Sequence, residues 1–341
     1  MKNLFNVAVL GSTGYVGLEL VKILSKHPKV KVQFLGSEKF KNKNINIFNN
    51  KIKNKNLPLI DFNKNFNPET FDYVFLCLPH GISQKYVKKI YNKVKIIDLS
   101  ADFRLDNINT YLKSYNINHV CPNFFNSFIY GLPEFNKKNI KKYSNIAVPG
   151  CYPTSVLTPL IPLFIKKIIS TKNIIIDSKS GYSGAGKKFD LKNIKNKEDF
   201  NFYNYNTNNH RHINEIQQEL NKYSKSNVSF SFNPHILPNY RGMMTTIYCD
   251  LNKNFKFYNV KNALINFSKK NHFVKIYTEK TRADFFSVQN TNNCIIKLFH
   301  HIDRNKIIIV SIIDNLIKGA AGQAVQCFNI NAQIDENLSL D

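Results

Sequence analysis

The sequence predicts an α/β protein: a Rossmann-type, doubly wound parallel sheet, followed by a second α+β domain with a mixed, mostly antiparallel sheet. Three observations lead to this prediction. Short apolar runs alternate with helical patterns over the first 150 residues, and the first run leads into a glycine-rich turn. Beyond residue 151, longer strand-like runs follow one another with few helices between them. Buried strands separated by helices form parallel sheets, whereas strands without crossover helices pair mainly antiparallel.

The first 150 residues contain apolar runs with the length and composition of buried strands: 5–10, 30–36, 73–79, 95–100 and 145–150. Apolar residues recur at helical spacing in the segments 15–27 and 83–93. The Lys- and Asn-rich segment 38–56 is expected to be a surface loop.

The second half predicts helices at about 154–167 and 212–224. Its strand-like runs are 173–181, 228–232, 243–251, 274–278, 294–301 and 306–314. The segment 318–330 is small and apolar on one side, so it can pack closely against another element.

The charge and cysteine content limit the function classes. The net charge is +25, but the excess is almost all Lys, scattered among Asn, Ile, Phe and Tyr, all residues with AT-rich codons. We therefore expect no specific nucleic-acid binding, and small anions as the partners of the Lys surplus. The six cysteines show no CxxC pair and no Cys/His cluster with metal-ligand spacing, which predicts no metal site. With no signal peptide and no apolar run long enough to span a bilayer, we expect a soluble, cytoplasmic protein with reduced thiols.

The glycine-rich turn "GSTGYVG" follows a strand-like run and opens a helical pattern. Glycines allow a tight turn and close approach to a pyrophosphate, which the helix N-terminus then binds. The alternative is an ordinary glycine turn. The predicted cofactor contacts are Gly11, Ser12, Thr13, Gly14, Tyr15, Val16 and Gly17.

The end of the second strand favours NADP over NAD. An NAD site usually has an acidic residue about 20 residues after the turn, and here that position is near Ser37, with Glu38 one place late. Ser37 and Lys39 would accept a 2′-phosphate. The general Lys excess is the alternative explanation for Lys39.

Cys151 stands in "AVPGCYPTS", between the end of a strand and the start of a helical pattern. The positive end of a helix dipole and its unpaired N–H groups favour the thiolate over the thiol. Beside a dinucleotide fold, this position predicts covalent acyl chemistry; the alternative is a structural cysteine in a turn.

The segment "NNHRHINEIQQEL" offers an acid or base. His212 and Glu215 are three residues apart, on one face of the coming helix, so the carboxylate can orient the imidazole and raise its pKa. His210 is the second candidate for the proton donor. A surface histidine pair at a helix start is the alternative.

Taken together, the motifs resemble the N-acetyl-gamma-glutamyl-phosphate reductase family of arginine biosynthesis, a branch of the semialdehyde dehydrogenase superfamily. The matching blocks run nearly end to end: "GSTGYVG", "LPHG", "DLSADFR", "YGLPE", "PGCYPT", "SGYSGAG", "HRHINEI", "PHILPNYRGM" and "DNLIKGAAGQAVQ". The "YGLPE" and "HRHINEI" blocks separate this family from the aspartate-semialdehyde dehydrogenases.

The resemblance implies an NADPH-dependent reduction of N-acetyl-L-glutamyl 5-phosphate to N-acetyl-L-glutamate 5-semialdehyde plus phosphate, through a thioester on Cys151. His212 would donate the proton. It also implies a discontinuous first domain, residues 1–150 completed by the C-terminal helix 315–341, and a catalytic and oligomerisation domain over 151–314. Members of this type form homodimers or homotetramers through the second domain's sheet.

The resemblance also suggests binding residues. It places His80, Gly81, Ser183, Gly184 and Asn315 at the cofactor. For the substrate's anionic groups we select arginines, whose guanidinium groups bind such anions bidentately. Arg104 is expected at the leaving phosphate, unless it pairs with a neighbouring aspartate, and the candidates for the α-carboxylate are Arg211 and Arg241.

Some positions depart from the family pattern. Ser155 and Pro159 replace small residues, Asn214 stands where Pro is common, and the segment 281–287 differs from the usual sequence. Two other functions stay open: a reductase of the same fold for another acyl phosphate, such as aspartyl phosphate or a carrier-bound aminoadipate, and a basic binding protein that has lost catalysis.

Overall fold

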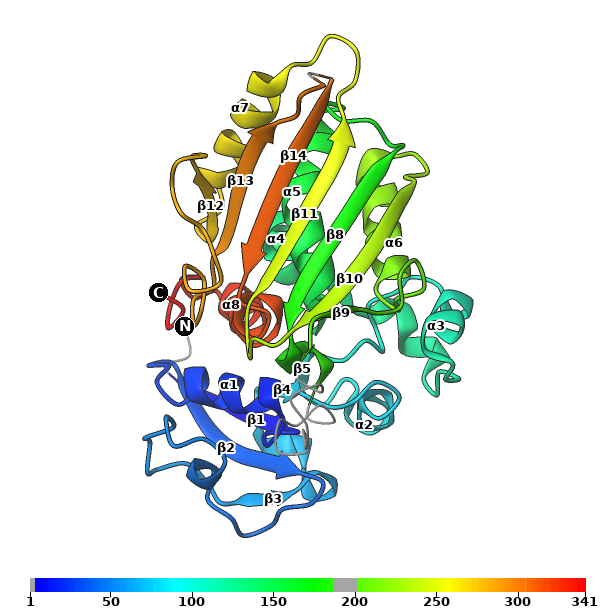
Figure 1. Ribbon diagram of the computed structural model, residues 1–341. Helices are drawn as coiled ribbons and strands as arrows, with labels where there is room; N and C mark the ends of the chain where they lie inside the picture. The colour runs from blue at the N-terminus through cyan, green and yellow to red at the C-terminus, as the bar shows by residue number, and fades with distance from the viewer. Residues whose placement is uncertain (1–3, 187–200, 304) are drawn as a thin grey trace. The chain divides into compact units, whose positions relative to one another are not determined.

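A computed structural model describes residues 4–186, 201–303 and 305–341 (Figure 1). The chain forms two compact units. The first comprises Met1–Pro149 and Ala320–Asp341, and the second comprises Gly150–Gly319. Each unit contains its own seven-stranded sheet.

The sheet of the first unit has the order β3-β2-β1-β4-β5-β7-β6, and every neighbouring pair is parallel. This confirms the predicted doubly wound sheet. Its strands are β1 (Phe5–Leu10), β2 (Val30–Ser37), β3 (Ile60–Phe62), β4 (Tyr73–Leu76), β5 (Lys95–Asp98), β6 (Ile129–Tyr130) and β7 (Asn145–Ala147). Its helices are α1 (Tyr15–Leu24), α2 (Ser83–Ile90), α3 (Ile108–Tyr115), α4 (Pro133–Ile140) and α8 (Gly322–Asn331).

The C-terminal helix α8 completes the core of the first unit. All of its residues are buried, polar ones included. Asn331 donates to Ile140 O at 2.6 Å and accepts from the Tyr73 hydroxyl at 2.7 Å, while Asn329 Oδ1 lies 3.0 Å from His27 Nε2. Buried polar groups are tolerated only when they are hydrogen-bonded, so these contacts fix where the tail packs.

The sheet of the second unit has the order β12-β13-β14-β11-β8-β10-β9. It is mixed and mostly antiparallel, as predicted: β8 with β10 and β12 with β13 are the parallel pairs. Its strands are β8 (Ile174–Gly181), β9 (Tyr203–Asn204), β10 (Phe230–Leu237), β11 (Met243–Asp250), β12 (Val274–Tyr277), β13 (Cys294–His300) and β14 (Lys306–Ile313). Its helices are α5 (Cys151–Ile165), α6 (Ile213–Ser224) and α7 (Phe257–Ser268).

Helix α5 is the buried centre of the second unit. Every residue from Tyr152 to Phe164 is buried, because the helix is apolar all around and packs on β11 and β14 and against α6 and α7. Figure 1 shows these helices along one face of the sheet. The helix therefore holds its first residue, Cys151, on a rigid support.

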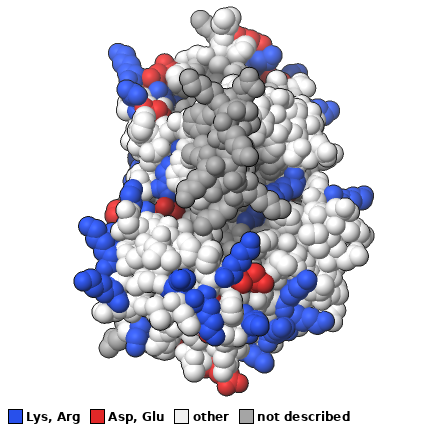
Figure 2. All heavy atoms as spheres, turned by 60° about the horizontal axis from the view of Figure 1, so that its bottom comes forward, with Lys and Arg blue, Asp and Glu red and all other residues white. Residues whose placement is uncertain are grey.

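The charged side chains on one face of the molecule are dispersed (Figure 2). On the face shown in Figure 2, Lys and Arg side chains lie in many separate places between uncharged surface, with a few Asp and Glu among them. In the part of the chain that the structure describes, no helix is long and apolar enough to cross a membrane.

Candidate active site

The turn Gly11–Gly17 links β1 to α1, as the sequence predicts. Gly11 has a φ of +76°, and a Cβ there would lie 2.3 Å from Cys77 O; a Cβ at Gly17 would lie 2.3 Å from Gly11 O. Both positions therefore require glycine. Gly14 is the N-cap of α1 and no side chain caps the first turn, so the geometry suits a pyrophosphate at the helix N-terminus.

Ser12 and Thr13 tie this turn to the end of β2. The Ser12 hydroxyl donates to Gly36 O at 2.9 Å, and the hydroxyls of Thr13 and Ser37 lie 3.0 Å apart. Ser37 is only 2% exposed, so its hydroxyl is engaged inside the protein. Lys39 is exposed. Tyr15 and Val16, also predicted as cofactor contacts, begin the first turn of α1.

A buried carboxylate, Asp102, fixes the loop between β4 and α2 that contains His80 and Gly81. Its Oδ1 accepts from the Gly81 N–H at 2.7 Å and its Oδ2 accepts from the Gln84 N–H at 2.9 Å. The Tyr111 hydroxyl donates to Oδ1 as well, at 2.7 Å. Gly81 has a φ of +78°, which favours glycine, and the Asp102 carboxylate holds the loop in this conformation.

Arg104 lies two residues after this carboxylate and is nearly buried. Its Nη2 donates to Leu99 O at 2.9 Å, so the guanidinium is oriented by the backbone that follows β5.

In the second unit, Cys151 is the first residue of α5, which confirms the predicted position at a helix N-terminus. Gly150 is the N-cap, in extended conformation, and no side chain caps this helix either. The thiol is half-buried. A helix N-terminus stabilises a thiolate, because its backbone N–H groups and the helix dipole favour negative charge.

Glu215, in the first turn of α6, reaches the residue before the cysteine. Its Oε1 accepts a hydrogen bond from the Gly150 N–H at 3.0 Å, and the side chain is almost fully buried. Helix α6 is therefore fastened to the N-cap of α5. The predicted role of Glu215 in orienting His212 remains a prediction.

His210 and His212 lie against Tyr152, the residue after Cys151. The ring centroids of Tyr152 and His210 are 5.2 Å apart, those of Tyr152 and His212 are 5.9 Å apart, and those of the two histidines are 4.8 Å apart. His212 is the N-cap of α6, one turn before Glu215. The structure thus brings the four predicted catalytic residues together within one unit.

His210 belongs to a chain of hydrogen bonds that runs in one direction. Its Nδ1 accepts from the His212 N–H at 3.1 Å, so in the neutral ring Nε2 carries the proton, 3.3 Å from the Tyr205 hydroxyl. Tyr205 donates to the Tyr152 hydroxyl at 3.3 Å, which donates to His235 O at 3.3 Å. Burial, with the nearby Arg211 charge, lowers the pKa of His210 to about 3. His210 is therefore neutral at physiological pH.

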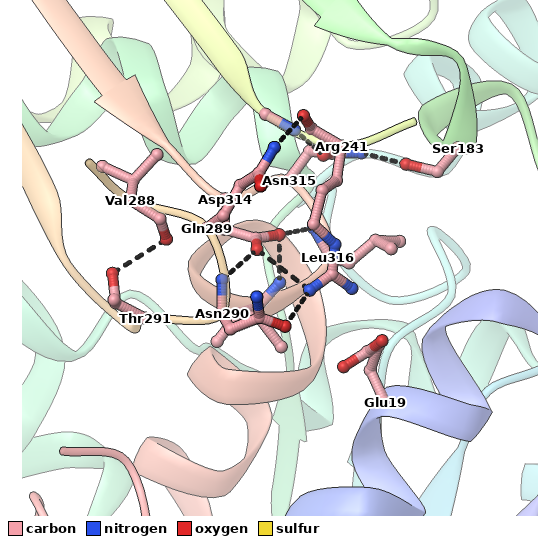
Figure 3. Close-up of polar contacts among 12 residues, drawn as sticks. Glu19, Ser183, Arg241, Val288, Gln289, Asn290, Thr291, Asp314, Asn315 and Leu316 are labelled. Atoms are coloured by element: carbon pink, nitrogen blue, oxygen red, sulfur yellow. Dashed lines mark hydrogen bonds and ion pairs between the residues drawn. The ribbon is translucent and has the colours of Figure 1, made fainter. Parts of the chain in front are cut away.

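Asn315 and Ser183, predicted at the nicotinamide, are bonded to each other (Figure 3). Asn315 Nδ2 donates to Ser183 Oγ at 2.9 Å, and Asn315 Oδ1 accepts from the Gly242 N–H at 2.8 Å. Gly184 follows at the surface.

The two arginines predicted for the α-carboxylate differ in exposure. Arg211 is exposed, whereas Arg241 is buried. Arg241 Nη1 donates to Asn290 Oδ1 at 2.5 Å and lies 3.4 Å from Asp314 Oδ2 (Figure 3). The guanidinium of Arg241 thus already has anionic and polar partners inside the protein.

Comparison with known proteins identifies the chain. Residues 6–143 match the model of the semialdehyde dehydrogenase NAD binding domain, and residues 151–315 match that of the semialdehyde dehydrogenase dimerisation domain. An N-acetyl-gamma-glutamyl-phosphate reductase of Ehrlichia canis is 42% identical over 98% of this chain and 97% of its own. Another, from Clostridium botulinum, is 39% identical over 99% and 98%. The chain belongs to the N-acetyl-gamma-glutamyl-phosphate reductase family.

Solved structures agree on the fold of this reductase family member. Aspartate semialdehyde dehydrogenase II from Vibrio cholerae superposes with a TM-score of 0.76 and 18% identity, over 97% of this chain and 99% of that one. At this identity the likeness shows the fold alone.

Two departures from the family pattern are accommodated in α5. The Ser155 hydroxyl donates to Tyr152 O at 3.0 Å and lies 2.8 Å from the Thr245 hydroxyl, so the added polar group is satisfied in the core. Pro159 lies inside the helix, which continues through it to Ile165. Arg282, in the departing segment 281–287, pairs with Asp284.

Sequence reasoning missed Tyr205 and Asp314 as contributors to the site. Tyr205 stands in the polar, aromatic segment 201–209, which carries no periodic pattern. Asp314 begins the block "DNLIKGAAGQAVQ", and its position directly after a strand and before glycine-rich sequence is the signal that could have found it.

Proposed function

We propose that this chain reduces N-acetyl-L-glutamyl 5-phosphate to N-acetyl-L-glutamate 5-semialdehyde and phosphate, with NADPH as the reductant and Cys151 as the nucleophile. One observation carries the proposal. Cys151 begins a buried helix, between an N-cap held by Glu215 and a tyrosine packed against His210 and His212, in a member of this reductase family.

The protein's part of the reaction follows from this geometry. The Cys151 thiolate attacks the acyl carbon, a C–S bond forms, and the C–O bond to phosphate breaks. A nicotinamide cofactor, when bound, would supply the hydride that reduces the thioester. Backbone N–H groups at the start of α5, which has no side-chain cap, stabilise the oxyanion. A histidine protonates this oxyanion to give the thiohemiacetal, and it takes the proton back when collapse breaks the C–S bond and releases the aldehyde and the thiolate.

His212 is the better proton donor of the two histidines. The pKa of His210 is lowered to about 3, so this ring holds no extra proton to give at neutral pH. Its fixed contacts with Tyr205 and the His212 N–H suit a residue that shapes the pocket. His212 is the N-cap of α6 and lies against Tyr152, the residue after Cys151.

The anionic groups of the substrate need cationic partners. We assign the leaving phosphate to Arg104, whose guanidinium is oriented through Leu99 O. We assign the α-carboxylate to Arg211, the exposed member of the predicted pair. Arg241, with its internal partners, has the role argued in the next subsection.

NADP specificity is the finer part of the cofactor proposal. The residues of the glycine turn suit any nicotinamide dinucleotide. The 2′-phosphate would lie near the end of β2, where Lys39 is exposed and Ser37 is small. Because Ser37 is engaged with Thr13, its contribution is chiefly to leave room, and Lys39 supplies the charge.

We further propose that the chain assembles through the sheet of the second unit. One row across four strands is apolar and in register: Ile175, Tyr248, Ile308 and Phe299. Ile175 is 51% exposed and Tyr248 is 37% exposed. A contiguous apolar row of this kind is typical of a protein interface, and a dimer or tetramer would cover it.

The test is the reverse reaction with purified protein, N-acetylglutamate semialdehyde, phosphate and NADP, followed at the NADPH absorbance band. We expect turnover with this aldehyde, more than tenfold slower turnover with aspartate semialdehyde, and a preference for NADP over NAD. Comparable turnover with aspartate semialdehyde, or with a carrier-bound aminoadipate semialdehyde, would assign another acyl phosphate. Salt-dependent binding of random nucleic acid with no turnover would indicate a binding protein.

A further inference from the structure

The turn between β14 and α8 contacts the proposed nucleophile directly. A Cβ built at Gly319 would lie 2.7 Å from Cys151 Cβ and 3.2 Å from Cys151 Cα. Two carbon atoms normally stay at least about 3.5 Å apart, so no residue with a side chain fits here without displacing the cysteine. Glycine at this position lets two backbones approach more closely than any other residue would allow.

This turn is a π-helix, Ile317–Ala321. The Gly319 N–H donates to Asp314 O at 3.0 Å, which closes the wide π turn. Isolated π turns are rare and occur often at functional sites, because their geometry must be held by the surrounding structure.

Asp314 holds the start of this turn. The carboxylate is fully buried; its Oδ1 accepts from the N–H groups of Leu316 at 2.9 Å and Ile317 at 3.2 Å. Its Oδ2 accepts from the Asn290 N–H at 2.8 Å and lies 3.4 Å from Arg241 Nη1 (Figure 3). A buried carboxylate keeps its charge only with such donors and a counter-charge, so Arg241 and the backbone N–H groups act together on it.

The residues around Asp314 lock the turn to its neighbours. Arg241 donates to Asn290 Oδ1, and Asn315 bonds both the Gly242 N–H and Ser183. Lys318, on the turn itself, is fully buried with its Nζ 5.7 Å from the centroid of the Phe273 ring. The turn is therefore fixed over the residues that lead to Gly319.

We propose that the turn Asp314–Ala321 is a positioning element for Cys151. Gly319 forms the wall against which the cysteine rests, Asp314 anchors that wall, and Arg241 supplies the counter-charge of the anchor. The inference rests on the proposed role of Cys151 as nucleophile. It gives Arg241 a function inside the protein rather than on the substrate.

The substitution Gly319→Ala tests the wall. Its readouts are the rate of Cys151 alkylation by iodoacetamide without substrate, the kcat and KM of the reductase reaction, and the melting temperature. Peptide mass analysis assigns the alkylated residue. The other cysteines are poor competitors, because most are buried and burial raises the pKa of the Cys77 thiol. We expect alkylation and kcat to fall by about 10- to 100-fold, the cost of misplacing a reacting group by about 1 Å, with KM changed less than threefold.

Ala263→Val is the matched control. It adds bulk at a buried position on α7, remote in sequence from the turn, and should lower the melting temperature without changing the alkylation rate. Alkylation and kcat of Gly319→Ala within twofold of the wild type would overturn the proposal. Equal loss of alkylation in Ala263→Val at a matched melting temperature would also overturn it.

Asp314→Asn tests the anchor and decides the matter if Gly319→Ala does not fold. It keeps the side-chain shape and removes the charge that Arg241 meets, so alkylation should fall severalfold in the absence of substrate. Unchanged alkylation with a raised KM would show that Asp314 does not anchor the turn and would instead indicate that Arg241 binds the substrate. The variant Cys151→Ser distinguishes failure of this proposal from failure of the proposed function. If Cys151→Ser keeps its reductase activity, Cys151 is not the nucleophile and the proposed function is wrong. The alkylation rates of Cys151 in Gly319→Ala and Asp314→Asn still test the contact between the turn and Cys151.

Discussion

The predicted sites of the two units depend on different parts of the chain: the backbone in the first unit and side chains in the second. In the first unit, the predicted cofactor site depends on backbone: Gly11 with a positive φ, Gly17 with no room for a Cβ, and the uncapped N-terminus of α1. In the second unit, the predicted catalytic site depends on side chains held by hydrogen bonds, such as Glu215 on the Gly150 N–H and His210 on Tyr205. Binding a dinucleotide needs many N–H groups in one place, whereas acyl chemistry needs a few groups with defined protonation. Substitutions should therefore act sterically at the glycine turn of the first unit and chemically at these side chains of the second. Gly319, whose substitution acts sterically on Cys151, is the exception in the second unit.

The largest effect should come from Cys151→Ser. The substitution removes one sulfur atom and leaves the helix start unchanged, but a serine hydroxyl is far less ionised than a thiol at neutral pH. We expect turnover to fall by about 10⁴-fold or more, with NADPH binding retained. Steady-state kinetics measure the turnover, and a fluorescence titration measures NADPH binding. Near wild-type activity here, with activity lost in a folded Cys77→Ser or Cys249→Ser variant, would show that another cysteine is the nucleophile.

The next effect should come from His212→Asn, with kcat lowered by roughly 10²- to 10⁴-fold, the usual contribution of a general acid or base. His210→Asn should mainly raise KM for the acyl phosphate, because the neutral ring of His210 shapes the pocket. Steady-state kinetics of both variants decide the assignment. If His210→Asn carries the large kcat loss and His212→Asn changes only KM, the roles are exchanged.

Gly17→Ala probes the first unit alone. The new Cβ would meet Gly11 O at 2.3 Å and the Ser12 backbone at 2.9 Å, so α1 must move away from the turn. We expect the dissociation constant for NADPH to rise by about tenfold or more, the effect of losing one or two hydrogen bonds to a charged group. Iodoacetamide labelling of Cys151 should stay at the wild-type rate. If the labelling rate of Cys151 falls by the same factor as the affinity for NADPH, the two sites do not depend on separate parts of the chain.

The effect with the least bearing on catalysis concerns pH and stability. The pKa of His210 is about 3 in the folded protein and 6.5 in the unfolded chain. Between these values only the unfolded chain binds the proton. Protonation of His210 therefore does not lower the free energy of unfolding above about pH 6.5, and it lowers this free energy progressively as the pH drops toward 3. At pH 5 the loss is about 2 kcal/mol relative to pH 7.5. Denaturant unfolding at both pH values should show a smaller difference for His210→Asn than for the wild type. The exposed His272→Asn is the control and should match the wild type.

The sequence predicts the two sheets and the start of α5 because these depend on local patterns. Buried parallel strands such as Phe5–Leu10 are continuous apolar runs, and a glycine followed by a helical pattern marks a helix start. The strands β3, β6 and β9 were missed because each has two or three residues, too few to show a period. Helix α7 was missed because its polar residues obscure the apolar stripe of Val260 and Leu264.

The site was predictable where one residue type carries the function, and less so where contacts join distant segments. Cys151 and His212 stand in recognisable blocks. The hydrogen bond from Gly150 to Glu215 joins residues 65 positions apart, and that from Asn315 to Ser183 joins residues 132 positions apart. Such pairs follow from packing of whole elements, which no short pattern contains. The same holds for Gly319, whose role depends on the proximity of α5.

The packing of α8 sets an order for synthesis of the protein. The second unit is one continuous stretch, Gly150–Gly319, whereas the first unit needs both Met1–Pro149 and the last residues of the chain. The first unit therefore cannot complete its core until the helix that carries Asn329 and Asn331 has been made. A purified chain truncated after Gly319 should resist protease in its second unit and be digested in its first. The part of the protein that is made first would thus be the part that matures last.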